Sequence, residues 1–282
     1  IAHEFGLTQP MVSKRIAWLE EELGVTLLRR STRGIEVTSE GQKLYRQGGR
    51  VLDELDAVLS SVKNERLQLS GVLRVTASLA FSRLIIAPLL TELNAQFPEL
   101  RLQFPLSDGY VDLVEKNIDL AFRIGDLPDS SLKAIRIGLS RRKIYASESY
   151  LKKFGKPKSL KELAEHRCLF YSRIADQPAW PLRDEKGKKV QFSFEPHLQS
   201  DGSELIREGV LNGMGIALLP TWMVEGRQDS RQVRAILLEH APEDSPLYIV
   251  TTGAKELTAK QRTVIEYFRK CFELNVELTL RA

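Results

Sequence analysis

FGLTQPMVSKRIAWLEEELGVTLLRRSTRGIEVT, residues Phe5 to Thr38, combines an amphipathic helix pattern with a basic turn. Thr8 and Pro10 suit the N-terminal cap and first turn of a helix, and Gly24 suits its C-terminal cap. Apolar side chains recur between them every three or four residues: Val12, Ile16, Leu19 and Leu23. The pattern predicts a helix whose apolar face packs against a core.

The opposite face of the first helical turns has no acidic residue, and a basic hairpin follows the helix. Gln, Ser and Lys side chains can reach base edges, and arginines neutralise phosphates, so this order indicates a major-groove helix beside a wing. Each feature alone is also explained by an ordinary amphipathic helix and a solvated charged turn. The candidate DNA-contacting residues are Thr8, Gln9, Pro10, Ser13, Lys14, Arg15, Arg30, Thr32 and Arg33.

A second helix is predicted after the wing, from Thr38 to Leu69, with Ser39 and Gln42 forming a capping box. Its length would be about 48 Å. The apolar residues recur mostly at three-, four- and seven-residue offsets: Leu44, Val51, Leu55, Val58, Val62 and Leu69. Such a stripe needs a partner, which is either the rest of its own domain or a second helix.

The pattern changes after residue 70. Strands are predicted at 72–78, 100–106 and 119–124, with helices at 88–97 and 110–116, which indicates a parallel sheet. Ligands bind such sheets at the carboxyl ends of the strands. The residues just beyond those ends (78–82, 107–109 and 123–126) offer hydroxyls, backbone amides and an arginine, which suit a carboxylate. Each loop taken singly is ordinary loop chemistry.

Three segments carry a family resemblance: TQPMVSKRIAWLEEELGVTLLRRSTRGIEVTSEG, LVEKNIDLAFRIGDLPDSSL and GMGIALLPTWM. They resemble the LysR-type transcriptional regulators, and the likeness covers essentially the whole chain. It implies an α plus α/β fold with a winged helix-turn-helix (1–37), a linker and dimerisation helix (38–70) and a two-lobed effector domain (71–282) like periplasmic binding proteins. The family has another helix before the residues matching Ile1 and Ala2, so the first domain is N-terminally incomplete in this sequence.

The resemblance places the first lobe at about 71–145 and 250–282, and the second at about 146–249. It implies a small-molecule effector between them, expected to be a carboxylate or an aromatic acid, and no cofactor. The implied lining is Ser78, Ser82, Ser107, Arg123 and Gly125 from the first lobe, and Tyr171, Ser172, Asp201 and Gly215 from the second. Asp201 would accept a hydrogen bond, and its charge argues against a second acidic group of the ligand at that place.

The implied partners are double-stranded DNA, a second copy of the chain in a homodimer or homotetramer, and RNA polymerase. Net charge gives no support for DNA binding, because five basic and five acidic residues balance within 1–37, and the surplus of +4 lies in 72–282. The support is the separation of charge, with Glu20, Glu21 and Glu22 late in the helix and cations at its start and in the wing.

Several function classes are disfavoured by the sequence. The chain has 282 residues, 43% of them hydrophobic, and no apolar run near the ~20 residues of a membrane span, so we expect a cytoplasmic, globular protein. Cys168 and Cys271 and the four histidines lack metal-site spacing, and Cys168 is expected to be a buried thiol. Without a GxSxG motif, a phosphate loop or a nucleophile–base pair, an enzyme is not expected. The alternative is a stand-alone small-molecule binder, or an enzyme on the solute-binding fold.

Overall fold

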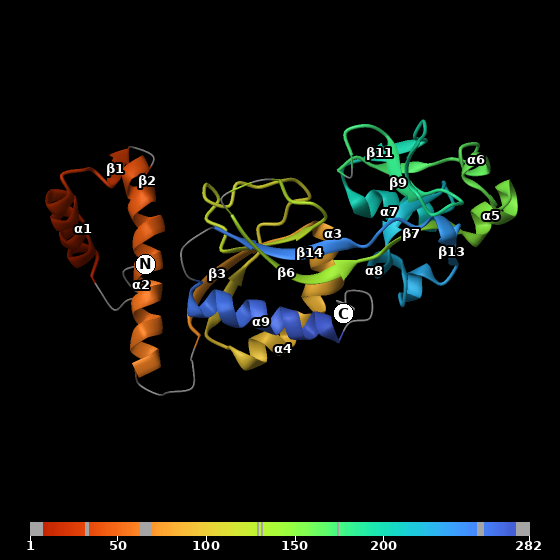
Figure 1. The fold of residues 1–282 in the computed structure, drawn as a ribbon. Coiled ribbons are helices and arrows are strands. Elements are labelled where there is room, and N and C mark those ends of the chain that lie inside the picture. Colours follow the sequence, from red (N-terminus) through yellow and green to blue (C-terminus); the bar gives the residue numbers. More distant parts are fainter. Residues whose placement is uncertain are drawn as a thin grey trace. The chain divides into compact units, whose positions relative to one another are not determined.

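A computed structural model of the chain describes residues 8–31, 34–62, 69–128, 130, 132–173, 175–252 and 257–274. The chain forms two compact units, residues 1–67 and residues 68–282 (Figure 1). Each unit has its own secondary structure and is described separately below.

The first unit contains α1 (Gln9–Leu23), β1 (Leu28–Ser31), β2 (Gly34–Val37) and α2 (Ser39–Val62). Thr8 is extended at the N-cap of α1, and Gly24 ends the helix in the left-handed region at φ 66°. The N–H groups of Gly24 and Val25 satisfy the carbonyls of Glu21 and Glu20, as in a glycine C-cap. Strands β1 and β2 pair antiparallel from Leu28↔Val37 to Ser31↔Gly34, which confirms the predicted wing hairpin.

The apolar face of α1 is less covered within this unit than its periodicity predicts. Val12, Ile16 and Leu19 are half-buried, but Leu23 is 46% exposed, so its assignment to a core is wrong. Leu23 occupies the last turn, where the helix already leads into the exposed Gly24–Val25 turn. Helical spacing shows which residues share a face, whereas coverage depends on what packs against that face.

Glu20 and Thr38 fix the wing against the two helices. The Glu20 carboxylate accepts hydrogen bonds from the N–H groups of Leu27 (2.6 Å) and Leu28 (3.0 Å). The Thr38 hydroxyl accepts from the Gly41 N–H at 3.0 Å, so Thr38 caps α2 and the predicted cap at Ser39 is wrong. Gly41 packs so closely that an added Cβ would lie 2.2 Å from the Leu27 carbonyl oxygen.

Helix α2 is shorter than predicted. It is described from Ser39 to Val62, residues 63–68 of the prediction lie outside the described residues, and Leu69 is buried but not helical. Strand β3 starts at Gly71, two residues after Leu69. Several large apolar side chains on α2 are exposed in the single chain: Tyr45, Val51, Leu52 and Leu55.

The first lobe of the second unit is built on a five-stranded sheet in the order β4-β3-β5-β14-β6. Its strands are β3 (Gly71–Thr76), β4 (Leu100–Gln103), β5 (Leu120–Ile124), β6 (Lys133–Ser140) and β14 (Ser245–Thr251). β3 is parallel to β4 and β5, as predicted, but β14 is antiparallel to both β5 and β6. The predicted parallel arrangement of the first three strands is confirmed, and β14, a strand from late in the chain, joins the same sheet in the antiparallel direction.

Helices cover this sheet. α3 (Leu79–Phe81), the π-helical η2 (Ser82–Ile86) and α4 (Ala87–Gln96) form one continuous run, and α9 (Ala259–Glu273) lies beside α4 (Figure 1). The Tyr267 hydroxyl of α9 donates to the Leu89 carbonyl at 2.7 Å. The helix predicted at 110–116 is wrong, since residues 113–117 form turns.

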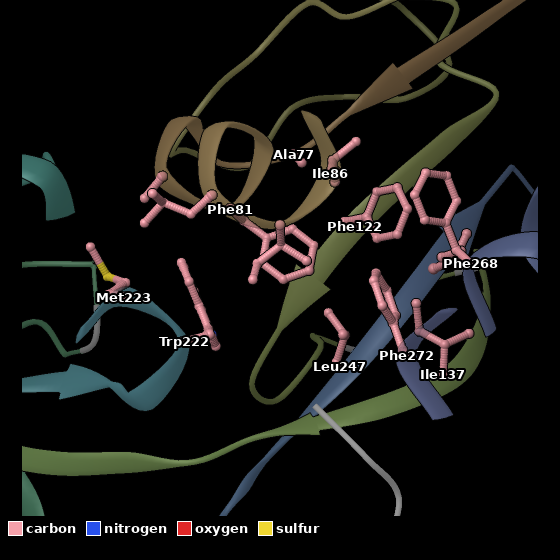
Figure 2. Packing of buried hydrophobic residues seen from close by; sticks show 14 of the residues in the cluster. Ala77, Phe81, Ile86, Phe122, Ile137, Trp222, Met223, Leu247, Phe268 and Phe272 are labelled. Atoms are coloured by element: carbon pink, nitrogen blue, oxygen red, sulfur yellow. The ribbon is translucent and has the colours of Figure 1, made fainter. Parts of the chain in front are cut away.

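Aromatic side chains fill the core between these helices and the sheet. Phe122 lies edge-on to Phe268 with ring centroids 5.0 Å apart, and Phe81 lies edge-on to Trp222 at 5.3 Å (Figure 2). Phe272 joins the same cluster. Trp222 belongs to α8 (Thr221–Val224) of the second lobe, so side chains of both lobes contribute to this core.

The second lobe is centred on β7 (Arg142–Ser147), which pairs antiparallel with β12 (Ala217–Pro220) and β13 (Val233–Ile236). β8 (Leu169–Tyr171) pairs parallel with β11 (Leu198–Ser200), and β9 (Ala179–Arg183) forms a hairpin with β10 (Lys189–Ser193). The helices are α5 (Glu148–Phe154), α6 (Leu160–Leu163), α7 (Ser203–Leu211) and α8 (Thr221–Val224), with short 3-10 turns η3 (Gln228–Ser230) and η4 (Leu238–His240).

The chain crosses between the lobes at two adjacent places. β6 ends at Ser140, which pairs with Ser245 at the start of β14, so the outgoing and returning segments lie side by side (Figure 1). Arg141 and Asp244 form an ion pair across them at 3.4 Å. The Trp222 indole N–H donates to the Ser140 hydroxyl at 2.9 Å, which attaches the second lobe to the same point.

Gly41→Ala should destabilise the first unit, because the new methyl group would overlap the Leu27 carbonyl and force the wing away from α2. We expect faster hydrogen exchange in peptides covering residues 27–41. The matched control is Gly49→Ala in the same helix, where an added Cβ meets nothing within 4 Å. It should stabilise α2 by roughly 0.5–1 kcal/mol. Equal exchange in the two variants would contradict the close-packing explanation.

Candidate functional site

The N-terminal half of α1 is an open surface within the first unit. Thr8, Gln9, Pro10, Lys14 and Arg15 are exposed, and Ser13 is half-buried. The first turn of α1, all of it described, has no acidic side chain. These turns are therefore accessible to a polyanion. Of the other predicted DNA-contacting residues, Thr32, Arg33 and the side chain of Arg30 lie outside the described residues.

The loops after β3 and β4 meet at one edge of the first lobe's sheet. The Ser107 N–H donates to the Ala77 carbonyl at 3.1 Å, and the Asp108 carboxylate accepts from the Leu79 N–H at 3.0 Å. The Ser78 hydroxyl accepts from the Phe81 N–H at 3.4 Å, capping α3, and the Ser107 hydroxyl accepts from the Gly109 N–H at 3.1 Å. The predicted convergence of these loops at the sheet edge is confirmed.

Arg123, on β5, is brought to the same loops. Its guanidinium donates to the Gly109 carbonyl at 3.1 Å and lies 5.4 Å from the centre of the Tyr110 ring. Burial lowers the pKa of this guanidinium, and the part of the chain that the structure describes offers it no carboxylate within ion-pair distance. Among the described residues, the half-buried Arg123 guanidinium thus contacts a carbonyl oxygen and an aromatic ring but no carboxylate.

The remaining first-lobe candidates play different local roles. Gly125 turns the chain after β5 at φ 102°, and its N–H donates to the Pro246 carbonyl at 2.9 Å. Ser82, in η2, is buried, and its hydroxyl has no hydrogen-bond partner among the described residues. A buried hydroxyl without a partner is costly, which makes Ser82 a candidate ligand contact.

The second lobe contributes the ends of β8 and β11. The Ser172 N–H donates to the Ser200 carbonyl at 2.9 Å, and Arg173 forms an ion pair with Asp201 at 2.9 Å. The Arg173 guanidinium nitrogens lie 3.6 Å from where a Cβ on Gly109 would be, so the two lobes touch here. Arg173 was missed in the sequence, where it is a lone arginine two residues beyond a strand end.

Tyr171 stands beside this ion pair. Burial, followed by the negative charge of Asp108, raises the pKa of the Tyr171 phenol to about 12. Asp201 raises it further, and Arg173 opposes the shift. Tyr171 therefore remains a neutral phenol, able to donate a hydrogen bond, at every physiological pH.

Close packing explains why residue 215 is a glycine. A Cβ at this position would lie 2.2 Å from the Arg167 carbonyl oxygen and 2.8 Å from the Leu169 side chain. Glycine is thus required for the close approach of neighbouring backbone segments. Its role as an effector-lining residue stays a prediction.

Direct contacts between α3–η2 and the second lobe were also missed in the sequence. Arg83 binds Glu204 through two hydrogen bonds of 3.0 and 2.8 Å, and the Arg227 guanidinium donates to the Leu84 carbonyl at 3.1 Å. The partners are 121 and 143 residues apart, so no local pattern reveals them. These bonds change if the lobes rotate relative to one another.

A separate hollow of about 640 Å³ lies on the second lobe, beside β13. Its lining includes Tyr145, Glu225, Arg227, Arg231 and Arg234, and none of the predicted effector residues. Cys168 is buried, and burial raises the pKa of its thiol to about 12, as befits a structural residue. The described residues contain neither a metal-binding group of His, Cys, Asp and Glu side chains nor a helix long and apolar enough to cross a membrane.

Comparison with known proteins identifies both units. Residues 2–42 match the family of bacterial regulatory helix-turn-helix proteins of the lysR type, and residues 66–272 match the LysR substrate binding domain. The chain belongs to the LysR-type transcriptional regulators. Its two matched regions account for the wing-bearing unit and for the two-lobed effector-binding domain.

Relatives of this LysR-type regulator match along most of their length. The transcriptional regulator CrgA of Neisseria meningitidis serogroup C is 32% identical over 267 residues, covering 94% of this chain and 89% of the relative. The transcriptional activator TtdR of Escherichia coli K12 is 33% identical over 268 residues, covering 94% and 86%. A solved structure of CrgA superposes with a TM-score of 0.67 at 30% identity, covering 95% of this chain and 91% of that one.

The raised pKa of Tyr171 in this LysR-type regulator can be tested by titration. Subtracting the 295 nm absorbance of Tyr171→Phe from that of the wild type should give no tyrosinate signal until above about pH 11, since an ordinary tyrosine ionises near 10. As a control, the same difference in denaturant should show ionisation near pH 10. A native signal at pH 10 would show that the phenol is not shielded.

Proposed function

We propose that this LysR-type regulator reads duplex DNA with the first turns of α1 and contacts the DNA backbone with its wing. The open, acid-free start of α1 beside the β1–β2 hairpin is the observation that carries the proposal. Gln9, Ser13 and Lys14 are suited to base edges, and the wing arginines, including Arg33, to phosphates. Thr8, Pro10, Arg15, Arg30 and Thr32 complete the proposed contacts.

A small-molecule effector, held where the two lobes meet, controls this binding. The unpaired Arg123 and the unsatisfied Ser82 hydroxyl support the first-lobe side, and Tyr171 with Asp201 supports the second. The effector is a carboxylate or an aromatic acid, since Arg123 favours an anion. It acts by binding one arrangement of the lobes more tightly than another, which shifts the population towards that arrangement.

The regulator acts as a homodimer, and dimers pair into tetramers. Exposed apolar side chains on α2, such as Val51 and Leu55, support a partner helix from a second copy. A two-fold pair of such chains presents two recognition helices to two half-sites. The protein works in the cytoplasm and does not catalyse a reaction, in line with relatives that are transcriptional regulators. RNA polymerase is a further partner in this proposal.

Band shifts with the regulator's own promoter region should show specific retention that weakens steeply with salt. Arg33→Ala should weaken binding to every sequence and lower the salt slope by about one, because it removes a phosphate contact. Gln9→Ala should lose roughly 1–3 kcal/mol only at particular bases. Arg101→Ala removes an exposed arginine from β4 and should leave both properties unchanged. Absence of specific retention by the wild type would overturn the proposed function.

A further inference from the structure

Two arginines from opposite lobes converge on Gly109. The Arg123 guanidinium donates to the Gly109 carbonyl at 3.1 Å, and the Arg173 guanidinium lies 3.6 Å from the Cβ position of the same residue. Since both groups touch one residue, they are within about 10 Å of one another. This separation fits the two ends of a small organic molecule.

The two cations differ in how their charges are balanced. Arg123 has no carboxylate partner in the described part of the chain, and the only acceptors it meets are the Gly109 carbonyl and the Tyr110 ring. Arg173 is already neutralised by Asp201 at 2.9 Å. Asp108, the other acid nearby, accepts a hydrogen bond from the Leu79 N–H. The four charges cancel overall, but among the described residues Arg173 contacts a carboxylate and Arg123 contacts none.

This difference in contacts determines which ligand group each arginine can bind. A carboxylate placed on Arg123 compensates a half-buried cation through charge-assisted hydrogen bonds. A second carboxylate placed on Arg173 would also face Asp201, and two like charges in contact disfavour binding. A hydroxyl has no such conflict, because it donates a proton to Asp201 while its oxygen accepts from Arg173.

We propose that the effector is a small acid with a single carboxylate, bound by Arg123, and a hydroxyl at its far end, bound by the Arg173–Asp201 pair. The inference rests on the proposed function, which places an effector between the lobes. It adds the number of charges on the ligand and assigns Arg173 a role in specificity. The neutral Tyr171 phenol beside the pair is a further donor to the same hydroxyl end.

The test compares two matched series of probes by calorimetry on the full chain: 4-hydroxybenzoate, benzoate and terephthalate, and 4-hydroxybutyrate, butyrate and succinate. We expect at least one hydroxy acid to bind about tenfold or more tightly than both its unsubstituted and its diacid analogue, because only the hydroxyl forms charge-assisted hydrogen bonds with the Arg173–Asp201 pair without adding a like charge. Measurement without DNA keeps this result separate from the band shifts.

Variants then assign the two ends. Asp201→Asn should reduce the difference in affinity between the hydroxy acid and the diacid. The diacid should bind more tightly to this variant than to the wild type, because the negative charge that repels its second carboxylate is gone. The Asp201 side chain is 67% exposed, so the substitution should not disturb folding. Arg123→Gln should weaken all acids, and Arg123→Lys should restore part of the loss. The control, Glu243→Gln, removes an exposed carboxylate that pairs with Arg183 on the same lobe, and should change nothing.

Three results would overturn the inference: a diacid that binds the wild type more tightly than its hydroxy acid, an unsubstituted acid that binds as well as its hydroxy acid, or no binding by either series. Specific DNA retention would still stand in each case. Loss of that retention, with the hydroxy-acid preference intact, would instead overturn the proposed function and leave the ligand assignment in place.

Discussion

The chain connects the two lobes where it crosses from β6 to β7 and where it returns into β14, and these two segments are adjacent. Ser140 pairs with Ser245, Arg141 pairs with Asp244, and Trp222 donates to Ser140. Rotation of one lobe relative to the other would have to take place about this paired strand connection. The lobes also contact each other directly, through Arg83 with Glu204 and through Arg173 beside Gly109, and these contacts change if the lobes rotate. The proposed effector site and the direct contacts between the lobes therefore lie in the same region, where the two lobes meet.

Features determined by neighbouring residues were predicted well from the sequence. Thr8 and Gly24 bound the first helix, the basic hairpin forms the wing, and the strand ends of the first lobe gather their polar loops as expected. These features depend on caps, alternation and turns within a few residues. The errors at Ser39, Leu23 and Leu69 concern element ends, where packing against distant segments decides the outcome.

Features created by distant pairs were not visible in the sequence. The antiparallel β14 enters the sheet from residue 245 onward, and Arg83 meets an acid 121 residues away. The candidate site shows the same limit: the resemblance implied Arg123, Tyr171 and Asp201, but the pairing of Asp201 with Arg173 is seen only in the folded structure. That pairing changes the interpretation of Asp201 from an isolated charge to half of a neutral donor–acceptor pair.

Gly41 packs directly against the Leu27 carbonyl, so the segment leading into the hairpin and helix α2 are in close contact. The Thr38 hydroxyl also donates to the Leu27 carbonyl and accepts from the Gly41 N–H, so the hairpin is fixed to the first turn of α2. A twist of that helix about its axis would swing the hairpin through the same angle. A small rotation of α2 would therefore change the direction in which the arginine-containing hairpin points.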